Sequence, residues 1–322
     1  MAKKIVIVLL VLGALAAGLA WMLKHEKNGV INGSADESLL QVVTTTTMVT
    51  DMVSQIGHGR VSVKGMMGPQ VDPHSYQVTF SDTAALQKAD LVFYSGFHLE
   101  GKMQDVLEKR NRKKGGVYAL TDGIPKEKQL KPQAQFEGYH DPHAWGDPAL
   151  WAHCVAVVVT ALSEADPDGA ETYQKRGNKY TAELEALHQW AKGRIAEIPE
   201  DQRVLVTSHD AFFYFGKAFG FEVRGLQGVS TNSESSLKDR ADLVQFIKDR
   251  KLKMIFPESS VNKKGIEAVA EEAGVRVSGH ELFSDAMGEP GDTVTLHGET
   301  YDKGTYIGMI KHNVNTIVDG LK

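Results

Sequence analysis

The sequence predicts an α/β protein with two lobes, each a mainly parallel β-sheet flanked by helices. Short runs rich in β-branched residues alternate with helical patterns in both halves of the chain, which is typical of β-α-β units. One much longer helical pattern separates the two halves and is predicted to link them. An Asp-Pro-His segment also occurs twice, at 72–74 and 141–143.

Residues 38–166 are predicted to form the N-terminal lobe. Short apolar runs predict four strands, at 39–46, 61–66, 91–94 and 117–120. Apolar residues with helical spacing predict four helices, at 48–56, 81–88, 99–110 and 148–164. Ser81 is expected to cap the second helix, because serine side chains accept bonds from free amides at helix starts. The long loop 121–140 is expected to be functional, since such loops are uncommon in compact domains.

The linking helix is predicted at 167–199, where Pro167 fits the first turn of a helix. Its apolar residues recur mostly three or four positions apart, and they are Tyr173, Tyr180, Leu184, Leu187, Trp190 and Ile195. A helix of about thirty residues spans about 45 Å. That length suffices for a helix that lies across both lobes.

Residues 200–322 are predicted to form the C-terminal lobe by the same alternation. Four strands are expected, at 203–207, 221–224, 253–256 and 275–278. Four helices are expected, at 212–219, 234–250, 263–273 and 305–321. Residues 279–303 contain several glycines and are predicted to be a loop.

Residues 1–37 are predicted to be a signal peptide or membrane anchor followed by a linker. The apolar run 5–23 lies between lysines and is long enough either to be an export signal or to span a membrane, so cleavage and retention both remain open. The location is therefore expected to be periplasmic or extracytoplasmic. Because the lone cysteine, Cys154, lies in an apolar run far from this segment, it is expected to be buried and the protein is predicted not to be a lipoprotein.

The net negative charge of the chain argues against nucleic acid as a partner. The 322-residue chain has a formal net charge of −5, and residues 1–27 contain four lysines and one glutamate, so the remainder carries −8. An acidic domain is a poor candidate for binding nucleic acid and a reasonable one for binding a cation. We expect a monomer that binds no nucleic acid.

Four side chains are the candidates for binding that cation. In open α/β sheets, ligands bind outside the carboxyl ends of the strands. His74 lies in the loop after one strand, His209 follows another by two residues, His143 ends the long loop, and Asp285 lies in the glycine-rich loop. Three imidazoles and one carboxylate form a suitable shell for a divalent metal. Since two of them come from each half of the chain, the metal site is predicted in the cleft between the lobes. The sequence neighbours expected to orient the rings are Asp72, Asp141 and Asp210.

The remaining histidines carry less information. His98, His140 and His280 are not assigned a role, and the histidines expected to be solvated include His58, His188, His297 and His312.

No nucleophile elbow, phosphate-binding loop, dinucleotide fingerprint or zinc-protease motif is present, so we do not expect an enzyme. A metal-dependent hydrolase that uses the same residues is the alternative from another class.

Several motifs occur in an order that resembles one known family. They are Asp-Pro-His-Ser-Tyr at 72–76, Asp-Pro-His-Ala-Trp at 141–145, Ser-His-Asp-Ala-Phe-Phe-Tyr-Phe at 208–215 and Glu-Leu-Phe-Ser-Asp-Ala-Met-Gly at 281–288. Over about residues 39–321 the chain is similar to zinc and manganese solute-binding proteins of ABC importers, closest to the TroA-like members. The resemblance implies that one metal ion is bound per chain and delivered to a membrane permease, with four ligands, His74, His143, His209 and Asp285.

The same resemblance bears on the choice of metal. Manganese-specific members typically carry glutamate at the position of His209, which favours Zn2+ for this chain. Dedicated zinc scavengers of the family often carry a histidine-rich loop before the second ligand, and residues 126–138 contain no histidine. Mn2+, with iron, therefore stays as the alternative cargo, and an adhesin that retains the metal is a third hypothesis.

Overall fold

The first lobe is built on a four-stranded parallel sheet in the computed structural model, which describes residues 39–131, 136 and 138–322. Its strands are β1 (Leu40–Thr44), β2 (Val61–Gly65), β3 (Leu91–Tyr94) and β4 (Val117–Ala119). Their order is β2-β1-β3-β4, and all neighbouring strands are parallel. The central strand β1 pairs on both sides, with Val42 opposite Val63 and Leu91. The predicted parallel α/β lobe is confirmed.

Helices follow each strand of this sheet, with boundaries that differ from the predicted ones. They are α2 (Thr47–Gly57), α3 (Phe80–Lys88), α4 (Gln104–Lys114), α5 (Pro148–Trp151) and α6 (Val155–Ala165), with short 3-10 turns at η2 (Gly101–Met103), η3 (Leu120–Gly123), η4 (Lys126–Lys128), η5 (Ala144–Gly146) and η6 (Ala152–Cys154). The predicted cap at Ser81 is wrong. Thr79 caps α3, because its hydroxyl accepts from the Asp82 amide while the Asp82 carboxylate accepts from the Thr79 amide.

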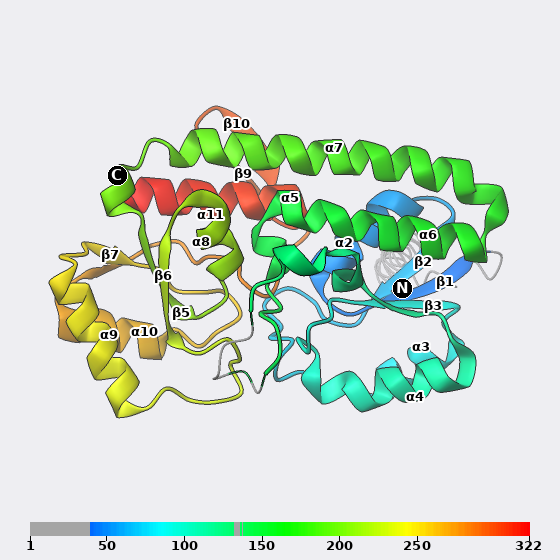
Figure 1. Ribbon diagram of the computed structural model, residues 1–322, viewed down its shortest axis with the longest axis horizontal. Helices are drawn as coiled ribbons and strands as arrows, with labels where there is room; N and C mark the ends of the chain where they lie inside the picture. Colours follow the sequence, from blue (N-terminus) through cyan, green and yellow to red (C-terminus); the bar gives the residue numbers. More distant parts are fainter. Residues whose placement is uncertain (1–38, 132–135, 137) are drawn as a thin grey trace, which may run out of the picture. The chain divides into compact units, whose positions relative to one another are not determined.

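Helix α7 (Ala170–Ile195) lies between the two lobes in sequence and has 26 residues, which correspond to about 39 Å. It is shorter than the predicted 167–199, because Pro167–Gly169 form a 3-10 turn (η7) and the helix ends four residues before Pro199. Its buried face includes Tyr173, Tyr180 and Leu184. Figure 1 shows α7 running alongside α6 of the first lobe and α11 of the second, both of which it contacts.

The second lobe contains two parallel strand pairs that lie next to each other. They are β5 (Val204–His209) with β6 (Glu222–Gln227), and β7 (Met254–Ile255) with β8 (Arg276–Val277). The Phe256 amide donates to the Val206 carbonyl at 2.9 Å, which joins the two pairs. The accompanying helices are α8 (Phe213–Phe219), α9 (Leu237–Asp249), α10 (Lys264–Ala273) and α11 (Tyr306–Leu321), with a 3-10 turn at η8 (Glu200–Gln202).

A β-hairpin lies inside the segment 279–303 that was predicted to be a loop. Strands β9 (Thr293–Leu296) and β10 (Glu299–Asp302) pair antiparallel. The two residues between them, His297 and Gly298, have φ of 52° and 80°. Positive φ at both central residues is the signature of a type I′ turn, whose twist matches that of the flanking strands.

The largest apolar core is continuous across both lobes. It joins Met48 of α2, Leu184 of α7 and Met309 of α11, while two smaller clusters lie around Val92 and Val206. Cys154 is buried in the large core, as predicted. Within the described residues, the helical stretch 148–165 is long and apolar enough to cross a membrane, but half of it is buried inside the protein, as in a core helix.

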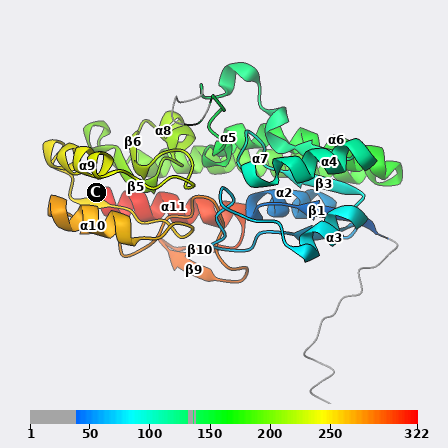
Figure 2. The ribbon, with the colours of Figure 1, turned by 90° about the horizontal axis from the view of Figure 1, so that it is seen from below.

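In the folded protein, the helices of the two lobes lie on opposite sides. Figure 2 shows α3 and α4 at one end and α9 and α10 at the other. Residues 40–322 form one compact unit by their contacts. The lobe boundaries 38–166, 167–199 and 200–322 stay a prediction, and the predicted signal or anchor at 5–23 lies outside the described residues.

Candidate metal site

Four buried side chains converge where the two lobes meet. They are His74, His143, His209 and Asp285, and each offers a nitrogen or oxygen atom within 4.8 Å of the other three. The His74 Nε2 lies 3.3 Å from His143 Nε2. One Asp285 oxygen lies 3.3 Å from His143 Nε2, and the other lies 3.3 Å from His209 Nε2. All four candidate residues from the sequence therefore lie together.

His209 is the last residue of β5, and not two residues beyond the strand as predicted. The strand is longer because its pairing with β6 continues up to His209 opposite Gln227. This pairing requires a glycine at position 225, since a Cβ there would lie 2.4 Å from the His209 carbonyl carbon and 2.5 Å from the Asp210 nitrogen. The close approach of β6 thus helps to fix the backbone of His209.

Asp141 orients His143, as the sequence predicted. One carboxylate oxygen of Asp141 accepts from His143 Nδ1 at 2.8 Å and from the His143 backbone amide at 2.9 Å. With Nδ1 donating, the lone pair of the neutral ring is on Nε2, which faces the other candidate ligands.

The predicted ring contacts of Asp72 and Asp210 are wrong. Asp72 accepts from the backbone amide of His74, and Asp210 accepts from the Gly225 amide. Neither is bonded to an imidazole. Asp210 directly follows His209, and successive side chains of an extended backbone point to opposite faces. The second oxygen of Asp72 accepts from the hydroxyls of Ser75 and Thr231 instead.

Glu258 instead orients His209, and the sequence reasoning missed it. Its carboxylate accepts from His209 Nδ1 and, at 2.8 Å, from the His209 backbone amide. Glu258 is buried and follows the short strand β7, where it bridges to Leu282. Glu258 follows the predicted strand 253–256 by two residues, which is the position at which the same rule selected His209 after the strand 203–207.

The loop that carries Asp285 is held from the first lobe. Trp145 Nε1 donates to the Ser284 carbonyl at 2.7 Å, and the Met287 amide donates to the Thr47 hydroxyl at 2.9 Å. These bonds flank Asp285 on both sides. The second Asp-Pro-His segment therefore supplies His143 and, through Trp145, also positions Asp285.

The electrostatics of the site favour a positive charge. Burial lowers the pKa of His74 to about 3. Burial also opposes protonation of His143, but Asp141 and Asp285 outweigh it and raise its pKa to about 9. Burial of Asp285 is outweighed by His209 and His143, so its pKa lies well below the usual value and the carboxylate is ionised. A divalent cation can replace the protons that such a site attracts.

Two atoms of the site lack hydrogen-bond partners among the described residues. These atoms are His209 Nε2 and Asp285 Oδ1, and both are buried. Each has another residue of the site 3.3 Å away, His143 Nε2 for Asp285 Oδ1 and Asp285 Oδ2 for His209 Nε2, but neither contact has hydrogen-bond geometry. Buried polar atoms are nearly always hydrogen-bonded, so these two need an explanation. Imidazole nitrogen and carboxylate oxygen are the donors that Zn2+ and related ions accept, so these residues fit a metal ion.

The other histidines lie elsewhere in the described chain. His98 stacks on Tyr139 with ring centroids 3.9 Å apart, and His140 Nδ1 contacts the Leu130 carbonyl at 2.8 Å. His280 packs edge-on against His312. The predicted solvation of His312 is wrong, because this residue is buried on α11.

This protein has two α/β lobes linked by one long helix, with three histidines and an aspartate buried between the lobes. This combination is characteristic of solute-binding proteins that carry a metal ion. The chain belongs to the ZnuA family, described as zinc-uptake complex component A periplasmic, whose model matches residues 42–320. This is a family of metal-binding, substrate-binding proteins of ABC importers, and the transport class is the one expected from the sequence.

Individual relatives agree with this assignment. The chain is 43% identical over 296 residues to the manganese-binding lipoprotein MntA of Bacillus subtilis, covering 90% of this chain and 92% of MntA. It is 43% identical over 286 residues to the zinc-binding protein TroA of Treponema pallidum, covering 87% and 88%. The solved structure of that periplasmic zinc-binding TroA superposes with a TM-score of 0.82 at 42% identity, covering 88% and 99%. The predicted two-lobe fold is thereby confirmed.

The prediction that the protein is not a lipoprotein is wrong. MntA is named a lipoprotein, and so are SsaB of Streptococcus sanguinis and MtsA of Streptococcus pyogenes, which are 28% and 29% identical to this chain. The prediction used the absence of a cysteine near residues 5–23. That absence is too narrow a reason to exclude the class, because the rest of the chain aligns with lipoproteins over nearly their whole length.

Proposed function

We propose that this protein captures one divalent transition metal ion outside the cytoplasm, with Zn2+ favoured, and delivers it to the membrane permease of an ABC importer. The observation that carries the proposal is the convergence of His74, His143, His209 and Asp285 within 4.8 Å in a buried position. The ion is the transported cargo, and these four side chains are its ligands. We further propose a monomer that binds no nucleic acid.

Zinc is favoured because three of the four donors are imidazole nitrogens, and nitrogen-rich shells favour zinc over manganese. The relatives do not share one cargo by name: TroA is named for zinc, MntA for manganese and MtsA for iron. Manganese or iron as the main cargo is therefore the alternative.

The proposed role is binding without catalysis. Metal-assisted hydrolysis requires an open coordination position for water and a nearby general base. Four protein donors fill the tetrahedral shell that structural zinc sites adopt. The two carboxylates closest to the rings, Asp141 and Glu258, already accept hydrogen bonds from the histidines they orient.

Elemental analysis tests the cargo and the ligands together. Protein purified under limiting metal and exposed to Zn2+ and Mn2+ in competition is expected to contain one ion per chain, mainly zinc. A His209→Ala variant is expected to lose most of its affinity, whereas His98→Ala, outside the site, retains it. Unchanged stoichiometry and affinity in the His209→Ala variant, measured by metal analysis and calorimetry, would refute the assignment of His209.

We also propose that residues 38–166 and 200–322 form the two lobes and that the segment 167–199, which contains α7, links them. A continuous helix such as α7 limits wide hinge motion, and the apolar core is continuous across both lobes. Release of the ion is then expected to depend on small shifts of the loops around the site.

A further inference from the structure

The three histidines of the site are not held equally well. Asp141 bonds the ring of His143 and Glu258 bonds the ring of His209, each through Nδ1. For His74, the described residues provide no hydrogen bond to Nδ1. His74 also lies in the irregular segment between β2 and α3, where its backbone amide donates to the carboxylate of Asp72 at 2.9 Å. The position of His74 thus depends on how its loop is held.

The second lobe holds that loop through two hydrogen bonds. The Thr231 hydroxyl donates to Asp72 at 2.7 Å, and the Asn232 side-chain amide donates to the His74 carbonyl at 2.9 Å. Asp72 uses its other oxygen for the His74 amide. Thr231 and Asn232, here called the interlobe contact, therefore fix the backbone of His74 from both sides.

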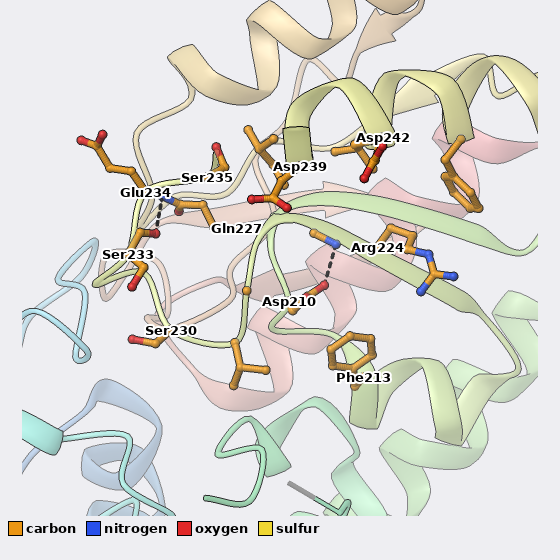
Figure 3. A pocket seen from close by; sticks show the side chains of 16 residues that line it. Asp210, Phe213, Arg224, Gln227, Ser230, Ser233, Glu234, Ser235, Asp239 and Asp242 are labelled. Atoms are coloured by element: carbon orange, nitrogen blue, oxygen red, sulfur yellow. Dashed lines mark hydrogen bonds between the residues drawn. The ribbon is translucent and has the colours of Figure 1, made fainter. Parts of the chain in front are cut away.

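The interlobe contact lies on a segment that is loosely held by its own lobe. Residues 228–236 connect β6 to α9, and several of them line an open pocket of about 460 Å³. Figure 3 shows Ser230, Ser233, Glu234 and Ser235 of this segment along one side of the pocket, facing residues of β6 and α9. The side-chain bond from Gln227 to the Ser233 carbonyl is long, at 3.5 Å. The segment therefore has room to shift.

The hydrogen bonds that hold the Asp285 loop differ from the interlobe contact in how far their side chains are buried. Trp145 and Thr47, which hold the Asp285 loop, are buried. Asn232 is exposed, and Thr231 is half-buried. A partner that touches the surface can reach the interlobe contact without opening the core, whereas the bonds of Trp145 and Thr47 are inaccessible to it.

We propose that Thr231 and Asn232 are positioning residues that set the rate of metal release by holding His74 in the ligand shell. When residues 228–236 shift, both hydrogen bonds break, and His74 leaves the ion before the better supported His143 and His209. This inference rests on the proposed function and assigns the release step to one segment of the second lobe.

The experiment compares zinc release from the full chain and from a Thr231→Val, Asn232→Ala double variant. Both proteins are loaded with Zn2+, mixed rapidly with excess EDTA and followed with a chromophoric zinc indicator. We expect release about tenfold faster in the double variant, equivalent to about 1.4 kcal/mol, with an association rate within about twofold of the parent's, because all four ligands are retained. Ser233→Ala is the matched control, since its side chain lies in the same segment and away from His74.

The rate of zinc release and the melting temperature of the metal-free protein together decide the outcome. Faster release in the double variant, with the melting temperature of the metal-free protein unchanged, supports the proposal. A release rate equal to the parent's overturns it, and so does an equal rise in the Ser233→Ala control. A parallel loss of metal-free stability also overturns it, because it indicates a purely structural role. Absence of bound zinc in the parent chain would overturn the proposed function as well, so the two failures are distinguishable.

Discussion

Glu258 illustrates how single residues outside the ligand set determine the geometry of the site. Its two bonds to His209 fix both the backbone and the ring, so that Nε2 points toward Asp285. Carboxylates that hold a ligating histidine in this way also increase the basicity of the ring. The contribution of Glu258 should therefore be visible in metal affinity.

We predict that Glu258→Gln lowers zinc affinity by about 10- to 100-fold, the usual effect of removing such a partner. Asp210→Asn is the control, because Asp210 is adjacent to His209 but bonds the Gly225 amide. Its affinity should stay within about threefold of the parent's. Competition titration against a chelator of known affinity measures both, and equal losses in the two variants would contradict the assigned role.

His312 should make the metal-free protein sensitive to acid. Its Nε2–H donates to the Glu281 carbonyl beside the Phe283 ring, and burial, aided by Lys303 and His280, lowers its pKa to about 4. Between the unfolded pKa of about 6.5 and this value, the unfolded chain binds the proton and the folded chain does not. The free energy of unfolding therefore falls as the pH drops, by about 3 kcal/mol over the whole window.

We predict that His312→Gln removes this contribution, because glutamine does not titrate. Urea unfolding of the metal-free proteins, compared at about pH 7 and about pH 4.5, should show a smaller acid loss in the variant than in the parent. Identical pH dependence of the two proteins would show that His312 does not contribute.

Residue roles were only partly predictable from the sequence. The four candidate ligands were found because each lies in or next to a loop that follows a strand, and two carry a repeated motif. Glu258 and the Thr231–Asn232 pair were missed because their partners are distant in sequence, and periodicity reports only local structure. His312 was misjudged because a polar residue on a helix was assumed to face solvent, whereas α11 is buried on most of its circumference.

At the scale of elements, the packing of α7 against α6 depends on a glycine. A Cβ at Gly177 would lie 2.5 Å from a methyl group of Val159, whereas at Gly193, on the same helix, it would meet nothing within 4 Å. The two glycines have the same intrinsic cost in a helix and different surroundings. They form a matched pair for testing this contact.

We predict that Gly177→Ala destabilises the protein by about 1–3 kcal/mol, the usual cost of overpacking. Gly193→Ala should stabilise it by about 0.5–1 kcal/mol, because alanine is the better helix former. Chemical denaturation measures both. If the two substitutions shift stability in the same direction, the close approach of α6 and α7 is not as described.

Most elements were predicted from periodicity, and the errors have local causes. Prolines and 3-10 turns shortened α7 and divided the helix predicted at 148–164. The β9–β10 hairpin was missed because its strands are short and lie among glycines. Its turn residues are His297 and Gly298, and His-Gly is not among the Asn-Gly, Asp-Gly and Gly-Gly pairs that mark such a turn in a sequence.

At the scale of the whole molecule, the site depends on both lobes being in place. His74 and His143 come from the first lobe, and His209 and Asp285 from the second. Hydrogen bonds also cross in both directions, from Trp145 to the Asp285 loop and from Asn232 to the His74 loop. No periodic pattern in the sequence specifies such contacts, so the sequence predicts two lobes with ligands from each but not the hydrogen bonds that cross between them.

X-ray absorption spectroscopy at the zinc edge of the zinc-loaded chain tests directly whether these side chains bind the ion. We expect one ion with three imidazole nitrogens at about 2.0–2.1 Å and carboxylate oxygen at about 2.0–2.2 Å. His143→Ala should lose one imidazole from this shell. A sulfur ligand, or a shell with fewer than three imidazoles in the unmodified chain, would contradict the assignment of His74, His143, His209 and Asp285 as the metal site.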